Sequence, residues 1–344
     1  MEGVLRMTQT SPDVSTSAGI IRLSNAFCDA KALLTAVELD LFTTLHNKGA
    51  STEEEIRKEL GLHGRGLSDW LNLLTALGLL ERAEGGYRNA KGADTYLVRG
   101  ERTWVGGFLE RSNRNLYPAW GRLGEALRTG EQQSGSHFDV VVQNPHILKQ
   151  FVHMMDALTH VVGPELVGKF DWSNSKSVLD VGGARGNLCS IIVKNQPHLE
   201  GHVFDLPPMK PLFDEHVESY GLTGKVHFHG GSFFTDPLPV KADVVTMGHV
   251  LHDWDRQQRG ELVAKAFDAV NPGGALIVYD RMLDDEPNHV ENLVISLDML
   301  LVTDGGSEYP TSELLEHAQK AGFASTEVKP LSDYDTVVIC RKAA

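Results

Sequence analysis

The sequence predicts a doubly wound α/β sheet in the second half of the chain and a mainly helical, winged-helix domain in the first half. Two observations predict the sheet. A short apolar run from residue 177 opens directly into glycines and then into a helical pattern over 187–195, and helix and strand patterns alternate from there to residue 279. A third observation predicts the winged helix: helical patterns from residue 20 lead into a hairpin signal at 84–87. A length of 344 residues fits two domains.

Composition and charge argue against several kinds of binding partner. The chain is 41% apolar and carries a formal net charge of −14, which argues against nucleic acid or an anionic membrane, because both require clustered Lys and Arg. Cys28, Cys189 and Cys340 are scattered and show no disulfide or zinc spacing. The polar N-terminus has no signal-peptide core, and the longest apolar stretch, 71–80, is too short to span a bilayer. We therefore expect a soluble, cytoplasmic protein.

The first half begins with a polar segment, 1–19, which we expect to be disordered. Apolar residues near helical spacing predict one or two helices over 20–45, and further helices over 53–60 and 64–80. Ser51 and Thr52 supply capping hydroxyls ahead of three glutamates. Glycines at 85 and 86 between short strand patterns complete the winged-helix pattern.

The winged-helix pattern raises the question of DNA binding, and the charges argue against it. The helix in the recognition position, 67–79, has no Lys or Arg, and the stretch 51–90 holds seven acids against five bases. A surface that reads a DNA groove is basic. The apolar residues of this helix are better suited to a core or a subunit contact.

Between the two domains, 102–169 is predicted to be helical, with breaks at Pro118, Gly130, Gly135 and Pro145, and the segment 164–177 is predicted to bridge into the sheet. A helical stripe in this region consists of Phe151, Met154, Met155, Leu158, Val161 and Val162. Such a stripe favours a core position, although Met also lines pockets for flat aromatic ligands.

The stretch 177–186, SVLDVGGARG, is the centre of the sheet domain. It gives the order strand, glycine turn, helix, which presents backbone N–H groups to a nucleotide-like ligand. The dinucleotide motif G-x-G-x-x-G does not fit, because Ala184 or Arg185 occupies the second glycine position. The pattern instead suits a ligand with ribose and adenine but no pyrophosphate. Asp205 ends the next strand, 23 residues after Gly182, where a carboxylate can accept both ribose hydroxyls. The alternative is a tight turn without a ligand.

The remaining elements of the sheet domain follow in order. Helices are predicted over 211–220 and 255–270, and strands over 202–204, 226–228, 242–247 and 275–279. Ligands of such sheets bind at the carboxyl ends of the strands. Five loops should therefore surround one crevice: 182–186, 205–206, 232–233, 248–253 and 280–283.

His252 is the candidate catalytic residue. It follows a strand at this edge, and histidine titrates near neutral pH and can remove a phenol or enol proton. Asp280 and Glu308 are placed to hold its imidazole in one tautomer. The alternative is that His252 and Asp253 merely cap the following helix. His227 and His229 point to the same side of a strand but lack a third metal ligand at suitable spacing, so we interpret them as sheet residues.

The assembly of motifs resembles the class I S-adenosylmethionine-dependent O-methyltransferases of the caffeic acid and acetylserotonin type, in their bacterial natural-product branch. The resemblance covers about residues 20 to 344. The matching motifs are YPAWGRL at 117–123, FVHMM at 151–155, LDVGG at 179–183, FDLP at 204–207, VLHDW at 250–254 and NPGG at 271–274, together with the winged helix.

This resemblance implies a Rossmann-like catalytic domain over 171–344, a helical linker and substrate-pocket region over 101–170, and a winged-helix dimerisation domain over 20–100. It also implies S-adenosyl-L-methionine as cofactor, no metal, and a homodimer that methylates the phenolic or enolic hydroxyl of a small aromatic secondary metabolite. By the same resemblance His252 is the general base, flanked by Asp280 and Glu308. The implied cofactor-binding residues are Gly182, Gly183, Asp205, Leu206, Ser232, Phe233 and Gly248, and the implied substrate-binding residues are Met155 and Asp253.

Three positions depart from the family pattern. Ala184 replaces a usual glycine, Ser232 an Asp that bonds the adenine, and Gly248 a Lys or Arg near the cofactor. These departures leave two alternatives open. One is a C-methyltransferase acting on a ring carbon ortho to a phenol, and the other is a non-catalytic winged-helix binding protein.

Overall fold

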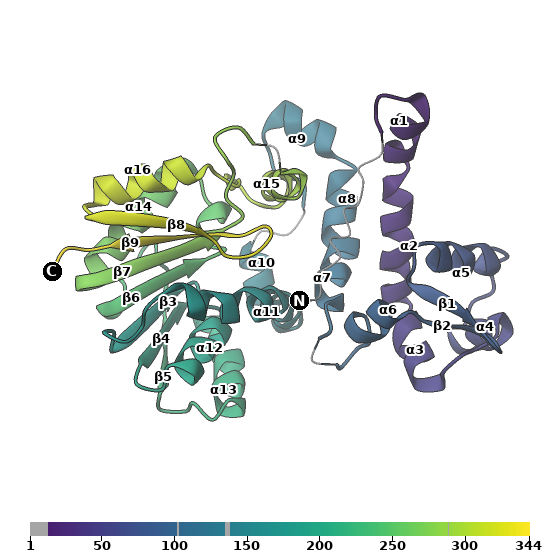
Figure 1. Cartoon of the computed structure of the whole chain (residues 1–344), viewed down its shortest axis with the longest axis horizontal. Coiled ribbons are helices and arrows are strands. Elements are labelled where there is room, and N and C mark those ends of the chain that lie inside the picture. Colours follow the sequence, from purple (N-terminus) through teal and green to yellow (C-terminus); the bar gives the residue numbers. More distant parts are fainter. Residues whose placement is uncertain (1–12, 102, 135–137, 288) are drawn as a thin grey trace, which may run out of the picture. The chain divides into compact units, whose positions relative to one another are not determined.

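The computed structural model describes residues 13–101, 103–134, 138–287 and 289–344 (Figure 1). The chain divides into two compact units at Asn113–Arg114. The first unit contains α1 (Ser17–Ser24), α2 (Ala26–Glu38), α3 (Leu41–Lys48), α4 (Glu53–Glu59), α5 (Leu67–Ala76), β1 (Leu80–Ala83), β2 (Gly86–Asn89), α6 (Lys91–Tyr96) and α7 (Gly106–Arg111).

The first unit has the predicted winged-helix order. The strands β1 and β2 pair as an antiparallel hairpin, and Leu71 and Leu74 of α5 are completely buried in the core. A capping box starts α4: the Thr52 hydroxyl accepts the Glu55 N–H, and the Thr52 N–H donates to the Glu55 carboxylate. One or two helices were predicted before α4, and the structure has three: α1, α2 and α3. The third is separate because its N-cap, Asp40, takes a left-handed φ of 57°. The first of them begins at Ser17, inside the segment expected to be disordered, of which residues 1–12 lie outside the described part.

A seven-stranded sheet organises the second unit in the part of the chain that the structure describes. Its strand order is β5-β4-β3-β6-β7-β9-β8, with β9 antiparallel to both of its neighbours and the other pairs parallel (Figure 1). The strands are β3 (Ser177–Val181), β4 (Glu200–Asp205), β5 (Val226–Gly230), β6 (Ala242–Gly248), β7 (Val270–Asp280), β8 (Ser325–Pro330) and β9 (Thr336–Arg341). The helices are η1 (Ser112–Leu116, begun in the first unit), α8 (Tyr117–Trp120), α9 (Leu123–Thr129), α10 (Phe138–Gln143), α11 (Pro145–Lys169), α12 (Asn187–Asn195), η2 (Pro207–Met209), α13 (Lys210–Ser219), η3 (Leu251–Asp253), α14 (Arg256–Ala269), α15 (Val290–Val302) and α16 (Thr311–Ala321).

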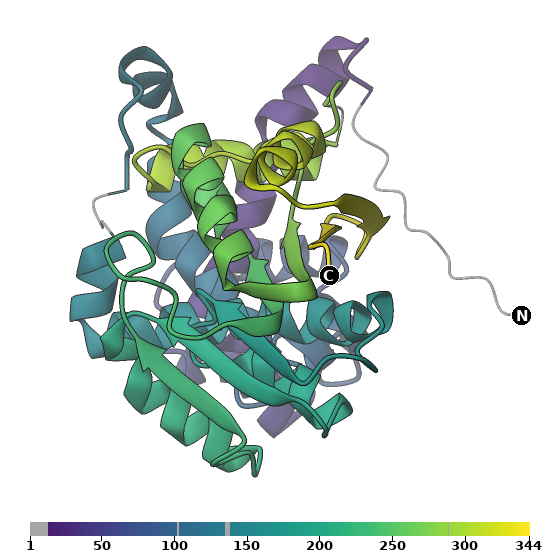
Figure 2. The same cartoon turned by 90° about the vertical axis from the view of Figure 1, so that its left-hand side faces the viewer.

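Alternating side chains build a core on each face of this sheet. Leu179 and Val181 of β3 belong to the cluster formed with α14 and α16, whereas Val178 belongs to the opposite cluster with α11, α12 and α13. Figure 2 shows the sheet domain from a second direction. Because helices cover both faces, a ligand reaches the central strands only at their ends.

Several predictions about single elements were wrong. Pro164 lies inside α11, which continues to Lys169 as the helical prediction over 102–169 has it, so the bridge into the sheet begins after Lys169 and not at 164. Pro118 occupies the first turn of α8 and does not interrupt the helical run from 106. Gly130 does end α9, in a left-handed conformation, whereas the break expected at Gly135 falls outside the described residues.

Asp253 does not cap the helix that follows it. The N-cap of α14 is Asp255, whose carboxylate accepts the Gln258 N–H in a capping box. The alternative interpretation of His252 and Asp253 as a helix cap is therefore wrong, and His252 is free of that role.

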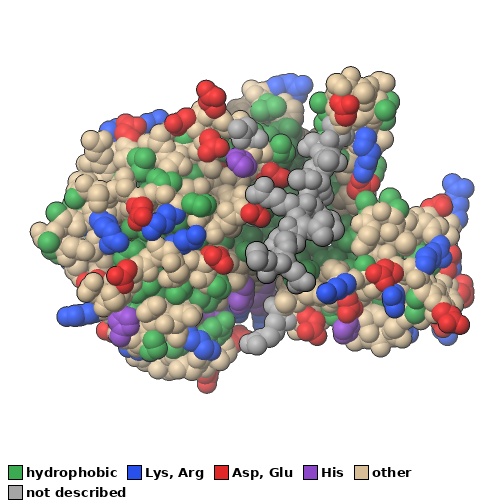
Figure 3. All heavy atoms as spheres, in the orientation of Figure 1, with side chains coloured by type: hydrophobic (Ala, Val, Ile, Leu, Met, Phe, Trp, Pro, Cys, Tyr) green, Lys and Arg blue, Asp and Glu red, His purple; other side chains and the backbone are tan. Residues whose placement is uncertain are grey.

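Charged side chains of both signs are mixed on the molecular face drawn in Figure 3, without a continuous basic band. None of the described helices combines the length and the apolarity that crossing a bilayer requires.

Candidate active site

The glycine turn after β3 needs a residue without a side chain at its first position. Gly182 has a φ of +71°, and a Cβ there would lie 2.6 Å from Val250 Cγ2. Its N–H donates to the Phe204 carbonyl at 2.8 Å, which ties the turn to the end of β4. Ala184, the departure from the glycine pattern, takes a left-handed φ of 47° as glycine would. The replacement therefore keeps the backbone of the turn.

Asp205 is fixed at the end of β4 by backbone donors. One carboxylate oxygen accepts the Ala184 N–H and the other the Leu206 N–H, both at 2.7 Å. Burial raises the pKa of Asp205 to about 6, although both hydrogen bonds act to lower it. Each oxygen keeps a further lone pair. The carboxylate is thus oriented and able to accept two more hydroxyl hydrogen bonds.

The loop after β5 lies beside Asp205, because the Gly231 N–H donates to the Asp205 carbonyl at 3.0 Å. In this loop Ser232 donates its N–H to the Asp236 carboxylate at 2.8 Å. Phe233 packs edge-on against Phe234 and Trp254, with ring centroids 5.0 and 5.8 Å away. The structure therefore places the predicted adenine-flanking residues next to the predicted ribose ligand.

Gly248, at the end of β6, is explained by its neighbour. A Cβ at this position would lie 1.9 Å from the Tyr279 ring, which occupies the space above it. No side chain fits there beside Tyr279. The departure at 248 is therefore matched by a large residue on the paired strand, β7.

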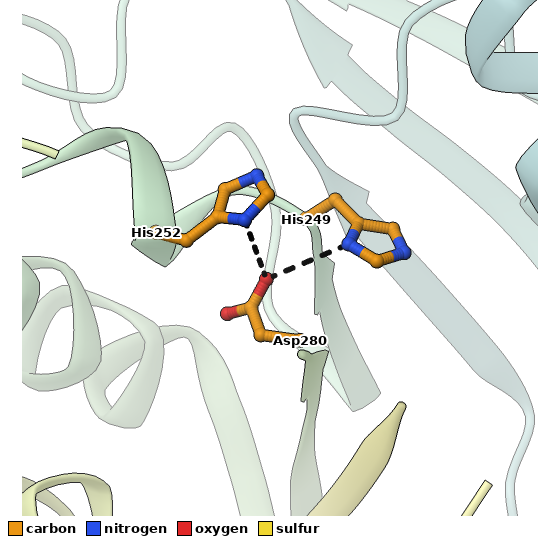
Figure 4. Close-up of side chains that lie close together, drawn as sticks. All are labelled: His249, His252 and Asp280. Carbon is orange, nitrogen blue, oxygen red and sulfur yellow. Dashed lines mark ion pairs between the residues drawn. The ribbon is translucent and has the colours of Figure 1, made fainter. Parts of the chain in front are cut away.

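His252, Asp280 and Glu308 come together from three separate segments. Glu308 Oε1 lies 2.8 Å from His252 Nδ1. Asp280 Oδ1 lies 3.9 Å from the same nitrogen, and Figure 4 shows this contact between His252 and Asp280. Both carboxylates are buried, and Tyr309 donates its hydroxyl to Asp280 Oδ2 at 2.5 Å. Since Nδ1 is engaged, Nε2 is the nitrogen left for an incoming ligand; its nearest charged neighbour is Asp253 Oδ1 at 3.8 Å.

The protonation of this cluster is set by burial and by the carboxylates. Burial lowers the pKa of His252, but Glu308 and Asp280 outweigh it and raise the pKa to about 10. Burial raises the pKa of Asp280 to about 8. A positively charged ligand beside the imidazole would oppose its protonation, because like charges disfavour each other.

Sequence reasoning missed two members of this cluster. His249, the first residue after β6, lies with Nδ1 3.8 Å from Asp280 Oδ1 and Nε2 3.5 Å from Asp335 Oδ1. Asp335 belongs to the turn between β8 and β9, two strands that the sequence analysis did not predict. The apolar run at 337–340 was the signal available for β9.

Some buried polar side-chain atoms beside the glycine turn have no hydrogen-bond partner among the described residues. Asp180 Oδ2 and both polar atoms of the Asn187 side chain are buried without a hydrogen-bond partner among the described residues. Asp180 Oδ1 accepts the Thr246 hydroxyl at 2.7 Å. Unpaired buried polar atoms are costly, so a polar ligand that contacts the turn would relieve them. This fits the methionine end of S-adenosylmethionine, with Asp205 at its ribose.

The two predicted substrate residues lie in different places. Asp253 Oδ1 lies 3.8 Å from His252 Nε2, whereas Met155 belongs to α11. Both residues are partly buried, and the Asp253 side chain is 44% exposed. The neighbour of Met155, Asp156, forms a buried ion pair with Arg185 of the glycine turn. The helix that carries Met155 is thus tied to the turn.

Comparison with known proteins agrees with this geometry. Residues 21–99 match the family model of the O-methyltransferase dimerisation domain, and residues 120–324 match that of the O-methyltransferase domain. The tetracenomycin polyketide synthesis 8-O-methyl transferase TcmO of Streptomyces glaucescens is 44% identical over 327 residues, covering 94% of this chain and 96% of TcmO. The N,N-dimethyltransferase OxyT of Streptomyces rimosus is 38% identical over 316 residues, covering 90% of this chain and 91% of OxyT.

Among solved structures, human N-acetylserotonin methyltransferase in complex with S-adenosylmethionine superimposes with a TM-score of 0.87 at 25% identity, covering 96% of this chain and 99% of that protein. Family, fold and cofactor thus agree with the expectation from the sequence motifs. The chain belongs to the O-methyltransferase family that combines these two domains, and it is an S-adenosylmethionine-dependent methyltransferase.

Proposed function

We propose that this enzyme methylates a phenolic or enolic hydroxyl of an aromatic polyketide and that His252 is its general base. The observation that carries the proposal is the 2.8 Å contact between His252 Nδ1 and Glu308, which fixes the ring and leaves Nε2 to take the acceptor proton. The polyketide class is supported by the similarity to TcmO, whose name places it in polyketide synthesis.

The residues of the chain have separate roles in this mechanism. When bound, S-adenosylmethionine supplies a methyl group on a positively charged sulfur. Asp205 and Leu206 would hold its ribose, Ser232 and Phe233 would flank its adenine, and Gly182 and Gly183 would leave room for its methionine end. Gly248 would contribute backbone only, because the Tyr279 ring fills the space of a side chain there. His252 Nε2 would take the hydroxyl proton, so that the acceptor oxygen presents a full lone pair to the methyl group that the cofactor would supply.

Glu308 and Asp280 orient the imidazole and stabilise the imidazolium that forms. Met155 and Asp253 contact the acceptor in this proposal. Because the reaction needs only alignment of two reactants and removal of one proton, we propose no role for a metal.

The dimerisation domain supports a homodimer. The helix α1 has no buried residue in the described chain, yet Ile20, Ile21 and Leu23 are apolar and more than half exposed, as is Phe27 at the start of α2. Such an apolar face is unfavourable in water and suits a second copy of this chain. We place the enzyme in the cytoplasm because all three cysteines are free thiols.

The test is incubation of the purified enzyme with isotopically labelled methyl donor and a panel of phenolic polyketides, read by mass and by carbon NMR of the new methyl group. We expect a methyl on oxygen, and activity at least about 100-fold lower in His252→Asn. The matched control is His227→Asn, a partly exposed histidine of β5, which should retain activity. Equal activity of wild type and His252→Asn would refute the role of His252.

The methyl chemical shift also separates the other acceptor atoms. A carbon-bound methyl would indicate the C-methyltransferase alternative on the same site. A nitrogen-bound methyl would follow the activity for which OxyT is named. Failure of every acceptor and of cofactor binding would indicate the non-catalytic alternative.

A further inference from the structure

The residues proposed for the cofactor follow one another along the carboxyl edge of the sheet. In the strand order β5-β4-β3-β6 (Figure 1), the adenine-flanking loop follows β5, Asp205 ends β4, and Gly182 follows β3. The register of β3 with β4 and with β6 continues to this level, so that Asp205, Gly182 and Gly248 lie in one row. Neighbouring strands are about 4.8 Å apart, so about 10 Å separate Asp205 from Gly248. A ligand with its ribose at Asp205 and its sulfur near Gly182 therefore reaches Gly248 with its amino-acid end.

The far end of the Tyr279 side chain lies over Gly248. The two residues pair between β6 and β7, and a Cβ at Gly248 would lie 1.9 Å from Tyr279 Cζ and 2.3 Å from its hydroxyl oxygen. Because the end of the ring and not its root occupies this place, the side chain extends from β7 across β6 in the direction of β3. The hydroxyl therefore lies one strand away from Gly182, at the place that the amino-acid end reaches.

The base cluster and the Tyr279 side chain lie on opposite faces of the sheet. Tyr279 belongs to the core cluster on the side of α11 and α12, whereas Val278 belongs to the cluster on the side of α14 and α16. Side chains alternate along a strand, so Asp280 is on the face of Val278, where it meets His252. The sulfur of the cofactor carries its methyl group and its amino-acid chain as separate branches. With the methyl group directed to His252, the other branch is left for the face of Tyr279.

An unpaired acceptor lies on the same face as Tyr279. Asp180 is on this face because Val181, its neighbour in β3, belongs to the opposite cluster. Asp180 Oδ1 accepts the Thr246 hydroxyl at 2.7 Å, whereas Oδ2 is buried without a hydrogen-bond partner among the described residues. A Cβ at Gly183 would lie 2.6 Å from Oδ2, so this oxygen faces the glycine turn. The turn therefore has an acceptor beside it and, in Tyr279, a donor.

The Tyr279 hydroxyl is available as a donor. Tyr279 is only 3% exposed, and its hydroxyl forms no hydrogen bond within the part of the chain that the structure describes. Burial, together with the charges of Asp180 and Asp280, raises the pKa of Tyr279, so the phenol keeps its proton. The same carboxylates disfavour a lone anion beside the hydroxyl. An amino acid is different, because its carboxylate brings an ammonium group with it.

We propose that the Tyr279 hydroxyl donates a hydrogen bond to the carboxylate of the amino-acid end of S-adenosylmethionine, and that Asp180 Oδ2 accepts one from the ammonium group. The two side chains then recognise both charges of the amino acid, and the unpaired oxygen of Asp180 gains a partner. Tyr279 thus places a side-chain donor at the end of β6, where Gly248 has none. This inference rests on the proposed position of the ribose at Asp205.

The test measures the Kd of three ligands by calorimetry for wild type and for Tyr279→Phe, which removes only the hydroxyl. S-adenosylhomocysteine has the whole amino-acid end, its decarboxylated analogue keeps the ammonium group alone, and methylthioadenosine has neither group. We expect Tyr279→Phe to raise the Kd of S-adenosylhomocysteine about tenfold, because a hydrogen bond to a charged group is lost. The Kd values of the other two ligands should not change.

Every other pattern contradicts the role of Tyr279. An unchanged Kd for S-adenosylhomocysteine would mean that the hydroxyl does not contact the cofactor. Equal losses for all three ligands would mean that Tyr279 acts through packing alone. A loss shared by S-adenosylhomocysteine and its decarboxylated analogue would place the hydroxyl at the ammonium group.

Asp180→Asn tests the other half of the proposal with the same ligands. The variant should weaken binding of the two ligands that carry the ammonium group and spare methylthioadenosine. Weaker binding of all three, or of none, would refute the role of Asp180.

Two further variants serve as controls. Tyr87 is also 3% exposed, but it belongs to β2 of the first unit, and its hydroxyl donates to Asn72 Oδ1 at 3.3 Å, so Tyr87→Phe should change none of the Kd values. All three ligands contain the ribose, so Asp205→Asn should weaken the binding of all three. Unchanged binding in Asp205→Asn would refute the proposed ribose site, and the pattern in Tyr279→Phe would still decide the present inference.

Discussion

At the scale of single residues, the site depends on carboxylates whose surroundings differ. Asp205 receives two backbone N–H groups, Asp280 receives the Tyr309 hydroxyl, and Glu308 contacts an imidazole. In the proposed mechanism the first accepts ribose hydroxyls and the third balances the positive charge of the imidazolium, whereas burial raises the pKa of the second to about 8. The same residue type would thus serve different functions according to its surroundings.

Replacing Asp205 should weaken cofactor binding. In Asp205→Asn the amide presents one oxygen and one NH₂ group to donors that both need an acceptor, so one backbone N–H and one ribose hydroxyl lose their partner. Lost hydrogen bonds to a charged group cost about 1.5–3 kcal/mol. We expect the Kd for S-adenosylhomocysteine, measured by calorimetry, to rise about 10- to 100-fold. The control Asp171→Asn, in the loop before β3, should bind as wild type does.

His216 should make the protein sensitive to acid. Burial lowers its pKa to about 4 in the folded state, against 6.5 for the ordinary side chain. Between these values the unfolded chain binds a proton that the folded chain does not, so the free energy of unfolding falls as pH decreases from about 6.5 to 4. We expect His216→Phe to flatten this slope in urea titrations at several pH values.

A histidine with the opposite shift provides the control. Asp94 raises the pKa of His46, so this residue contributes stability below pH 6.5 that is lost as pH rises through the folded-state value. His46→Gln should therefore change the slope with the opposite sign. Equal slopes in wild type and His216→Phe would contradict the assignment of His216.

At the scale of elements, the sequence predicted those whose signals are local. Gly186 is the N-cap of α12, and the helix predicted over 187–195 was confirmed to the residue. The strand β3 and the hairpin β1–β2 were also found, because alternation and turn residues define them. The bridge into the sheet was predicted to begin at Pro164, but α11 continues through this residue, since the packing of that helix against α12 outweighs the missing hydrogen bond.

Only part of the candidate site could be predicted from the sequence, because one of its contacts depends on the pairing of distant strands. The convergence of His252 and Asp280 follows from the rule that loops at the carboxyl ends of strands meet. Glu308 lies between the helices α15 and α16, so this rule does not place it. The contact between His249 and Asp335 depends on β9 lying antiparallel beside β7, which brings a distant turn to the same edge. No local pattern in the sequence encodes that pairing.

The ion pair between Asp156 and Arg185 should stabilise the junction of α11 with the glycine turn. Asp156→Asn leaves the partly buried guanidinium of Arg185 without its counter-charge, and the loss should lie below the about 3–5 kcal/mol typical of a fully buried pair. We expect a clear loss of thermal stability. The double variant Asp156→Leu with Arg185→Met removes both charges and should recover most of it. A double variant as unstable as the single one would show that the pair itself is not the cause.

At the scale of the whole molecule, we expect the apolar face of α1 and α2 to hold two chains together. Ile21→Asp combined with Phe27→Asp places charges in that face and should convert a dimer into monomers, as measured by light scattering during size-exclusion chromatography. The control Val328→Asp alters an exposed apolar residue of β8 and should leave the dimer intact. A dimer that survives the double substitution would place the interface elsewhere.

The central claim is that His252 removes the acceptor proton during methyl transfer. The most direct measurement is single-turnover methylation of phenols of graded acidity by wild type and by His252→Asn. A phenol that is already ionised needs no base, so we predict that the deficit of the variant is largest for the least acidic phenol and shrinks steadily as acidity increases. A deficit of the same size for every phenol would contradict the account, because it would mean that His252 acts on something other than the proton.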